Sequence, residues 1–321
     1  MTYLEAAEFL KSHDNYLLLT HKRPDGDTIG SAAGLCELLR AMGKTAWLLP
    51  SLDATKVFQD YLQGRQAPPD FAPGTVVSVD VASLGLLPAN AAPYQGRIDL
   101  AIDHHPSNEF FAQETCLEAD KAACGEIVWK IADRLGIMNS AIAAPLYVAV
   151  ATDTGCFVYG NTTPHTHRVA AALMEQDIPY QALNKKHFRT KSLHRMKLES
   201  LILQNMKLYQ EGTVAVAPIS LAMMAQAEAT DDDAEDIAAF LGQIEGVLHS
   251  ATIRELRPGE CKISLRTNPN YLNATATCAR LGGGGHVAAS GCTVRGTVDE
   301  AETAILEAIY AQLAEQARTG L

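Results

Sequence analysis

Paired cysteines and long apolar runs are absent from the sequence. The seven cysteines are an odd number without a Cys-x-x-Cys pair, which argues against a disulfide framework and against a zinc knuckle. The longest nearly uncharged apolar run, Ile142–Ala151, is about half as long as a membrane span. The N-terminal segment MTYLEAAEFLKSHD carries acidic residues where a signal peptide has basic residues and an apolar core. We therefore expect a cytoplasmic chain with reduced thiols.

An excess of positive charge is also missing. Asp and Glu total 37 against 26 Lys and Arg, which gives a formal net charge of −11. Stable binding of duplex DNA depends on the neutralisation of many phosphates, so this composition argues against it. If the chain handles anionic substrates, positive charge must be concentrated in a pocket or supplied by bound metal.

The length of 321 residues and the 47% apolar content predict about two domains, each with its own core. The first half alternates short apolar runs with helical patterns, which predicts a doubly wound α/β domain with a parallel sheet over residues 1–183. Helices are expected over 28–42, 125–135 and 141–151. The expected strands are Tyr16–Leu19, Thr45–Leu49, Thr75–Val79 and Ile98–Ile102.

The second half has a different texture. Residues 184–210 are basic, helix-prone and free of Pro and Gly, so we expect a connecting helix there. Residues 211–321 combine alternating strands, a glycine run and a final helix over 299–317, which predicts a smaller α+β domain.

Acids and histidines follow the apolar runs of the first domain. In an open parallel sheet the carboxyl ends of the strands form the ligand-binding edge, so these groups should meet there. So many carboxylates would repel one another without a cation, and a carboxylate–imidazole set without thiolate suits Mn²⁺ or a similar ion. Two ions would use all the ligands, as in phosphoester-cleaving sites. The residues are His21, Asp25, Asp27, Asp80, Asp103, His104, His105 and Asp153.

Each of these features also has a purely structural interpretation. Asp25-Gly26-Asp27 alone is typical of a tight turn with a helix cap, and Asp103–His105 alone fits an exposed loop. Their joint occurrence at successive strand ends favours the site.

The second domain offers candidates for anion binding. The glycines at 282–285 precede His286 and predict a phosphate-binding turn that opens a helix, with a flexible loop as the alternative. Arg266 carries a planar guanidinium suited to phosphate, although an arginine at the end of a strand is also common on surfaces.

Together these motifs resemble the DHH phosphoesterase superfamily. The resemblance rests on H-x-x-P-D-G-D-x-x-G-S (21–31), V-D-V-A (79–82), D-H-H (103–105) and T-D-T-G-x-F (152–157). L-G-G-G-G-H-x-A-A-S-G (281–291) and S-L-R (264–266) are similar to the DHH-associated domain. The compact two-domain length resembles the NrnA group, which are oligoribonucleases (nanoRNases) and 3′-phosphoadenosine 5′-phosphate (pAp) phosphatases.

The resemblance implies a role for each site residue. His21 and Asp25 would hold one Mn²⁺ ion, Asp27, His104 and Asp153 a second, and Asp80 both. Asp80, Asp103 and His105 would form the catalytic centre, with His105 facing the phosphate and Asp103 orienting a histidine. The substrate residues would be Ser264, Arg266, Gly284, Gly285 and His286.

The same resemblance implies short single-stranded RNA and pAp as substrates, with no membrane partner. A linear or cyclic dinucleotide phosphodiesterase, a RecJ-like single-strand exonuclease and a non-catalytic nucleotide sensor stay open as alternatives, and so does a homodimer.

Overall fold

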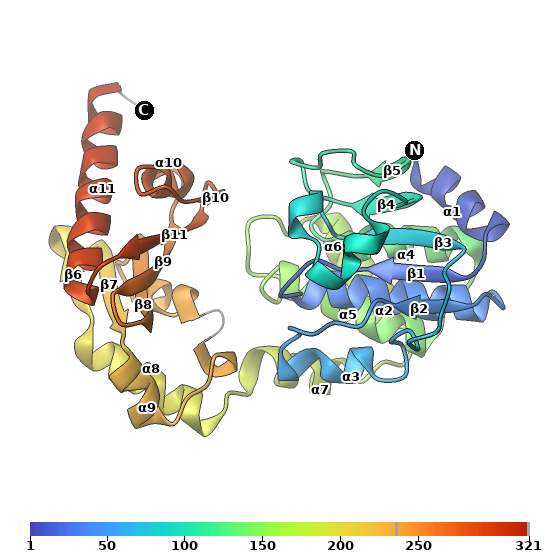
Figure 1. Cartoon of the computed structure of the whole chain (residues 1–321), viewed down its shortest axis with the longest axis horizontal. Coiled ribbons are helices and arrows are strands. Elements are labelled where there is room, and N and C mark those ends of the chain that lie inside the picture. Colours follow the sequence, from blue (N-terminus) through green and yellow to red (C-terminus); the bar gives the residue numbers. More distant parts are fainter. Residues whose placement is uncertain (235–236, 320–321) are drawn as a thin grey trace. The chain divides into compact units, whose positions relative to one another are not determined.

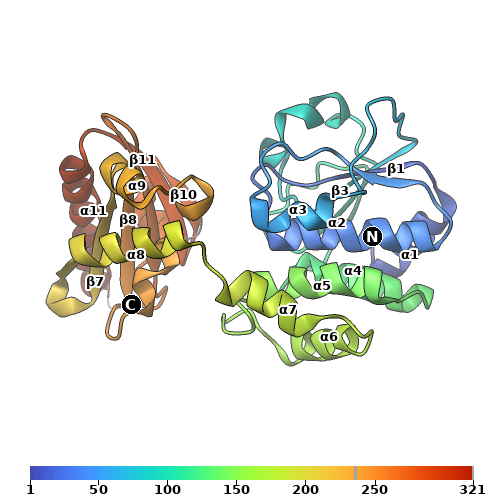
Figure 2. The ribbon, with the colours of Figure 1, turned by 90° about the horizontal axis from the view of Figure 1, so that it is seen from below.

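The computed structural model describes residues 1–234 and 237–319. They divide into two compact units, Met1–Thr190 and a second that begins at Lys191 (Figures 1 and 2). Residues 235–236 and 320–321 of the predicted second domain lie outside the described residues. Among the helices of the described ranges, none combines the length and the apolar character needed to cross a membrane.

The first unit contains a five-stranded, all-parallel sheet with the order β2-β1-β3-β4-β5. The order reverses at β1, which pairs with β2 on one side and β3 on the other, so the ends of β1 and β3 form a topological switch point. The strands are β1 (Tyr16–Leu19), β2 (Ala46–Leu48), β3 (Thr75–Val79), β4 (Leu100–Asp103) and β5 (Glu114–Leu117). The helices are α1 (Tyr3–Ser12), α2 (Gly26–Ala41), α3 (Gln59–Leu62), α4 (Cys124–Leu135), α5 (Ser140–Asp153), α6 (Pro164–Met174) and α7 (Tyr180–Asn184), with shorter helical turns η1 (Lys56–Phe58), η2 (Leu84–Leu86), η3 (Ala89–Tyr94) and η4 (Lys185–Arg189).

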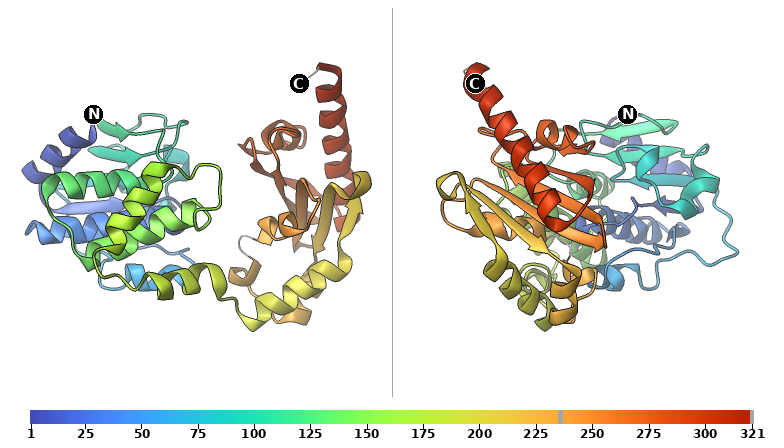
Figure 3. Two further views of the ribbon diagram at one scale, coloured as in Figure 1. Left: turned by 180° about the vertical axis from the view of Figure 1, so that it is seen from behind. Right: turned by 60° about the vertical axis from the view of Figure 1, so that its left-hand side comes forward.

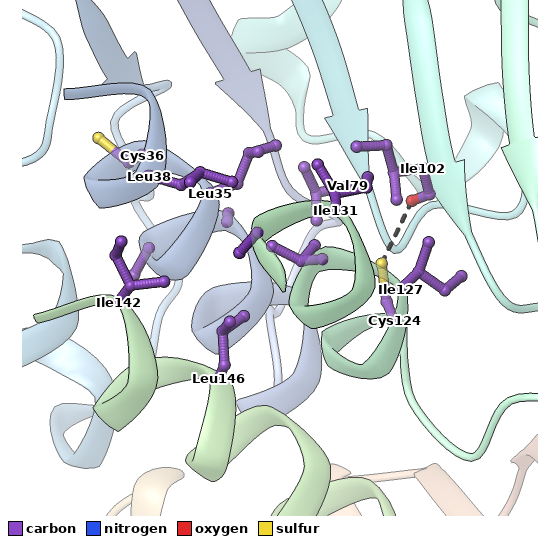
Figure 4. Close-up of a cluster of buried hydrophobic side chains, with 14 of the residues drawn as sticks. Leu35, Cys36, Leu38, Val79, Ile102, Cys124, Ile127, Ile131, Ile142 and Leu146 are labelled. Carbon is purple, nitrogen blue, oxygen red and sulfur yellow. Dashed lines mark hydrogen bonds between the residues drawn. The ribbon is translucent and has the colours of Figure 1, made fainter. Parts of the chain in front are cut away.

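The two faces of this sheet are covered differently. Helices α2, α4 and α5 build the larger core on one face, where Val79 and Ile102 of the sheet meet Leu35, Ile127 and Leu146 of the helices (Figure 4). In the described part of the chain the other face is covered by η2, η3 and irregular segments instead of α-helices. This differs from the expected doubly wound arrangement, because Pro93 lies inside the segment between β3 and β4 and only short 3₁₀ turns form there.

Glycines allow α2 and α5 to approach closely. A Cβ at Gly30 would lie 2.4 Å from the Pro145 carbonyl oxygen, and one at Gly34 would lie 2.5 Å from a methyl carbon of Leu146. A Cβ at Gly26 would lie 2.3 Å from the Thr152 hydroxyl oxygen. The spacing of four residues places the three glycines on one face of α2, and this contact brings the last turn of α5 beside the first turn of α2.

The predicted connecting helix over 184–210 is wrong as a single helix. The chain passes from α7 through a π-helical turn (η4) and becomes extended at Thr190 and Ser192 before α8 (Leu193–Asn205). The hydroxyl of Thr190 donates to the Lys185 carbonyl, and the hydroxyl oxygen of Ser192 accepts from the Arg195 N–H as the N-cap of α8. Side-chain hydrogen bonds therefore end one helix and begin the next without Pro or Gly.

The second unit contains a six-stranded mixed sheet with the order β10-β11-β9-β8-β7-β6. Helices α10 and α11 pack over one face, and α8 and α9 pack against the other (Figure 3). The strands are β6 (Lys207–Tyr209), β7 (Val214–Ile219), β8 (His249–Arg257), β9 (Glu260–Thr267), β10 (Gly284–His286) and β11 (Ala289–Arg295). The further helices are α9 (Leu221–Ala227), α10 (Ala274–Ala279) and α11 (Val298–Thr319), with 3₁₀ turns η5 (Gln210–Gly212), η6 (Asp232–Ala234), η7 (Ile237–Ala239) and η8 (Leu241–Gln243).

Candidate functional site

The loop after β1 supplies His21 and Asp25, and the first turn of α2 supplies Asp27. Asp25 is the N-cap of α2, and its Oδ1 accepts from the Asp27 N–H at 3.0 Å and from the Thr28 N–H at 3.1 Å. His21 Nδ1 lies 3.0 Å from the Lys22 carbonyl oxygen, which acts only as an acceptor. The ring proton is therefore on Nδ1, and the lone pair of Nε2 is available to a ligand.

Asp80 follows β3 directly and has a backbone φ of 60°, in the left-handed region that non-glycine residues rarely adopt. Its N–H donates to the Ile102 carbonyl at 2.9 Å, so the residue is tied to β4. The side chain is buried, and Oδ1 has no hydrogen-bond partner among the described residues. An orphaned carboxylate oxygen in the interior indicates a missing cationic partner.

His104 lies at the centre of one ligand group. Its Nδ1 is 3.1 Å from the Lys121 carbonyl oxygen, which leaves Nε2 to face three carboxylates. Nε2 lies 3.6 Å from Asp27 Oδ2, 3.5 Å from Asp80 Oδ1 and 3.7 Å from Asp153 Oδ2. Ligand atoms bonded to one ion at about 2.0–2.2 Å are separated by roughly 3.0–3.6 Å, so these distances suit a shared cation better than direct hydrogen bonds.

His21 forms a second group on the other side of Asp80. Its Nε2 lies 3.6 Å from Asp25 Oδ1 and 3.9 Å from Asp80 Oδ2. The two oxygens of Asp80 thus face different histidines. Three groups have ligand atoms within 4.8 Å of one another, as a three-ligand metal site requires: His21, Asp25 and Asp80; Asp27, His104 and Asp153; and Asp80, His104 and His105.

Asp27 is held by backbone N–H groups at the start of α4. Cys124 N donates to Oδ2 at 2.7 Å, Gly125 N donates to Oδ1 at 3.1 Å, and the Ser31 hydroxyl donates to Oδ1 at 2.8 Å. Both amides belong to the first turn of a helix, where the macrodipole favours negative charge.

The electrostatics of the carboxylates also fit a cation. Burial raises the pKa of Asp80 well above its ordinary value, and the carboxylates of Asp27 and Asp25 raise it further. Burial, with the Asp27 carboxylate, raises the pKa of Asp153 to about 7. Burial likewise raises the pKa of Asp27. A bound divalent ion would restore the ionised form of all three, so the residues present fit the metal chemistry expected of them.

His105, the last residue of the Asp103-His104-His105 motif, is oriented differently from His104. His105 Nδ1 lies 2.8 Å from Asp103 Oδ1 and 3.5 Å from Asp80 Oδ1, so its short hydrogen bond is to Asp103. Burial is the largest single influence on His105 and opposes its protonation, but the hydrogen bond to Asp103 and the nearby carboxylates of Asp103, Asp27 and Asp153 together raise the pKa of the imidazole. Asp103 itself is buried as the last residue of β4.

The substrate residues predicted in the second unit lie on three adjacent antiparallel strands. Arg266 on β9 pairs with Ala289 on β11, which pairs with His286 on β10. The neighbouring row joins Ser264, Gly291 and Gly284 in the same way. Because the rows are two residues apart, Ser264 and Arg266 share one face of the sheet.

The glycine run does not open a helix, contrary to the expectation. It enters β10, where Gly285 has φ of 144° and a Cβ would lie 2.7 Å from the Ala289 carbonyl oxygen. A Cβ at Gly283 would lie 2.2 Å from the Gly291 carbonyl oxygen. Gly283 and Gly285 are needed because the backbone there approaches the neighbouring strand β11 too closely for a side chain.

The interpretation of the sequence missed two contributions to the site. The glycines of α2 signal their role by recurring every four residues at positions 26, 30 and 34. The second contribution is Asn108, five residues after Asp103, whose amide nitrogen donates to Asp103 Oδ2 at 2.6 Å. An isolated Asn in a loop carries no comparable signal.

Comparison with known proteins gives matches to both units. Residues 15–150 match the DHH family, N-terminal domain, and residues 211–315 match the DHHA1 domain. The chain is 31% identical to the bifunctional oligoribonuclease and PAP phosphatase NrnA of Thermus thermophilus, over 96% of this chain and 93% of that protein.

Two solved structures share the fold. An exopolyphosphatase-related protein from Bacteroides fragilis superposes with a TM-score of 0.87 at 23% identity, covering 96% of each chain. The exonuclease RecJ bound to manganese has a TM-score of 0.52 at 14% identity, covering 98% of this chain and 94% of that one. With both domain matches and a full-length relative above 30% identity, the chain belongs to the DHH family of metal-dependent phosphoesterases that carry a DHHA1 domain.

Proposed function

We propose that this protein is an Mn²⁺-dependent hydrolase that degrades short RNA oligonucleotides to mononucleotides and removes the 3′-phosphate of pAp. The observation that carries the proposal is the set of overlapping His/Asp groups that share Asp80 and His104. The 31% identity to an oligoribonuclease and PAP phosphatase, which extends over both units, supports these substrates.

Two divalent ions would be held by residues of the first unit. His21 and Asp25 would hold one ion, Asp27, His104 and Asp153 the other, and Asp80 both. Imidazole and carboxylate ligands without thiolate suit Mn²⁺, the metal bound by the related RecJ exonuclease. The ions would supply Lewis acidity toward the phosphoryl oxygens and a nucleophile from water at neutral pH.

The protein's own residues would supply orientation and proton transfer. With Nδ1 hydrogen-bonded to Asp103, the opposite ring nitrogen of His105, Nε2, would face the phosphoester. From Nε2 a protonated His105 would donate to a phosphoryl or leaving-group oxygen. Its raised pKa favours the protonated form near neutral pH.

The second unit would bind the nucleotide. Arg266 would offer its guanidinium to a phosphate, and His286 lies in the same row of paired strands. Ser264 and the N–H groups of Gly284 and Gly285 would add uncharged donors.

An assay panel with purified full-length protein and Mn²⁺ tests the proposal. It compares a diribonucleotide, a 5-mer, a 24-mer, pAp, a cyclic dinucleotide and an RNA duplex at one salt concentration. We expect release of mononucleotides from the diribonucleotide and 5-mer and of phosphate from pAp, with lower kcat/KM on the 24-mer and no cleavage of the duplex. The net charge of −11 disfavours a long polyanion.

The panel also separates the alternatives. Equal or higher kcat/KM on the 24-mer would favour a RecJ-like exonuclease, and cleavage of the cyclic dinucleotide alone would favour a cyclic-dinucleotide phosphodiesterase. Tight binding of pAp without release of phosphate would indicate a nucleotide sensor.

A further inference from the structure

Asn108 is a buried amide in the loop after β4, and its orientation is set by two partners. Its Nδ2 donates to Asp103 Oδ2 at 2.6 Å, and its Oδ1 accepts from the Phe110 N–H at 2.7 Å. A backbone N–H can only donate and an ionised carboxylate can only accept. A flipped amide would lose both hydrogen bonds, so Asn108 has a single favourable orientation.

The two oxygens of Asp103 have separate partners. Oδ1 accepts from the backbone N–H of His104 at 2.8 Å, from the N–H of His105 at 3.2 Å and from His105 Nδ1 at 2.8 Å. Oδ2 accepts from Asn108. A carboxylate group is planar, so a donor fixed on Oδ2 limits rotation about the Cβ–Cγ bond and thereby fixes the position of Oδ1.

The loop is shaped to deliver this donor. Phe110 has φ of 53°, a left-handed conformation that a bulky residue adopts only under external constraint. The Glu109 N–H donates to the Ala82 carbonyl at 2.9 Å, and Asn108 Nδ2 also reaches the Val81 carbonyl at 3.3 Å. Asn108 therefore ties the segment that follows Asp80 to the end of β4.

We propose that Asn108 is a positioning residue that acts through Asp103 to hold the His105 ring in its reactive orientation. The inference rests on the proposed phosphoesterase function and adds to it a residue outside the metal-ligand groups. Two backbone N–H groups hold Oδ1 of Asp103, and Asn108 is the side-chain donor that holds Oδ2, so it helps to fix the plane of the carboxylate that orients the imidazole.

The test uses Asn108→Asp, which keeps the size of the side chain but replaces the donor with a second carboxylate oxygen. Asn108→Ala is the second variant, because it removes the donor without adding charge. Asn90→Asp is the matched control, since Asn90, in η3 of the same unit, donates from Nδ2 to the Pro50 carbonyl at 2.7 Å.

Hydrolysis of bis(p-nitrophenyl) phosphate with Mn²⁺ gives the first readout. We expect both Asn108 variants to lower kcat by about 10- to 100-fold, the usual effect of losing an outer partner at a metal site, with KM and bound metal unchanged. In a His105→Ala background the Asn108 substitutions should lower kcat by less than a further twofold, because the imidazole that Asn108 positions is absent. The proposal would be overturned if the losses of kcat from the Asn108 and His105 substitutions multiplied in the double variants. Loss of bound metal in the Asn108 variants would also overturn it.

The second readout needs neither substrate nor metal. In metal-free protein labelled with ¹⁵N-histidine, the Nδ1–H resonance of His105 is identified by its absence in His105→Ala. We expect that resonance in the wild type and in Asn90→Asp, and its shift or loss in both Asn108 variants. An unchanged resonance in both would overturn the proposal even if turnover fell. Since this measurement is independent of any nucleotide, failure of the substrate panel would leave the result for Asn108 intact.

Discussion

The two units bring polar groups together in opposite ways. In the first unit the ligands come from segments as far apart as His21 and Asp153, are buried or half-buried except for the exposed Asp25, and include carboxylates that repel one another. In the second unit the candidate substrate residues follow from the pairing of three neighbouring strands, and Gly284–His286 is exposed. The first arrangement lowers the stability of the fold unless a cation or protonation compensates the charge, whereas the second is stabilised by the sheet itself.

Glycine permits close backbone contact in both units, between helices in the first and between strands in the second. Gly26, Gly30 and Gly34 let two helices touch, which brings Asp153 to Asp27. Gly283 and Gly285 let two strands touch, which aligns His286 with Arg266. In both units a close backbone contact at glycine brings functional side chains from neighbouring positions together.

The largest expected effect comes from Asp80→Ala. Because both oxygens face ligand groups, turnover should fall by more than about a hundredfold and both ions should bind more weakly. The metal-free variant should also unfold at a higher temperature than the metal-free wild type at pH 7.5, since a buried carboxylate with a raised pKa is destabilising when ionised. Metal analysis and thermal unfolding check both points, with exposed Asp70→Asn as the control. Near wild-type turnover would rule out the shared-ligand assignment.

Arg266→Ala should have the next largest effect and leave the first unit untouched. Loss of a charged hydrogen bond is worth about 1.5–3 kcal/mol, so KM should rise about ten- to a hundredfold while kcat and metal content stay constant. Arg266→Lys should recover part of the loss, because it restores charge without the planar fork. The control is Arg295→Ala on β11, at the other end of the same strand pairing. A fall in kcat with unchanged KM would contradict a binding role.

Gly285→Ala should disturb the hairpin, and Gly284→Ala should not. The former combines a positive φ with a clash against the Ala289 carbonyl, while a Cβ at Gly284 meets nothing within 4 Å. Strain of this kind costs about 1–3 kcal/mol. Hydrogen exchange of peptides over 260–295 should accelerate in Gly285→Ala alone. Equal protection in the two variants would contradict the account of the glycine run.

The smallest expected effect is the pH dependence of stability caused by Asp153. Its folded pKa of about 7 lies above the ordinary value of 3.8, so the wild type loses stability as pH rises through that window. The interval from 3.8 to about 7 corresponds to about 4 kcal/mol, which solvent screening of a side chain that is 32% exposed reduces to about 1 kcal/mol. Metal-free Asp153→Asn lacks this loss and should therefore melt a few degrees above the wild type at pH 8. The two proteins should converge below pH 4, and Mn²⁺ should stabilise the wild type more. A difference in melting temperature between the two proteins that stays constant across pH would exclude ionisation of Asp153 as the source of the pH dependence.

Much of the fold could be predicted from local pattern. The strand over Thr75–Val79 has the expected bounds, and α5 contains the whole of the predicted 141–151 helix. The strand β5, with only one fully buried residue, was not predicted, because its pattern is too weak without its partner β4. The break at 190–192 was missed because hydroxyl side chains end and begin helices there without Pro or Gly.

By itself the sequence determined which residue types follow each strand, and with them the family, because motif letters and their order are properties of the chain. Only the tertiary structure decided that the two oxygens of Asp80 face different histidines, that Asn108 contacts Asp103, and that the glycine run is a strand. Those facts depend on carboxylate rotation, ring orientation and strand pairing between distant segments. Such geometry follows from packing in three dimensions, and no local pattern of residues encodes it.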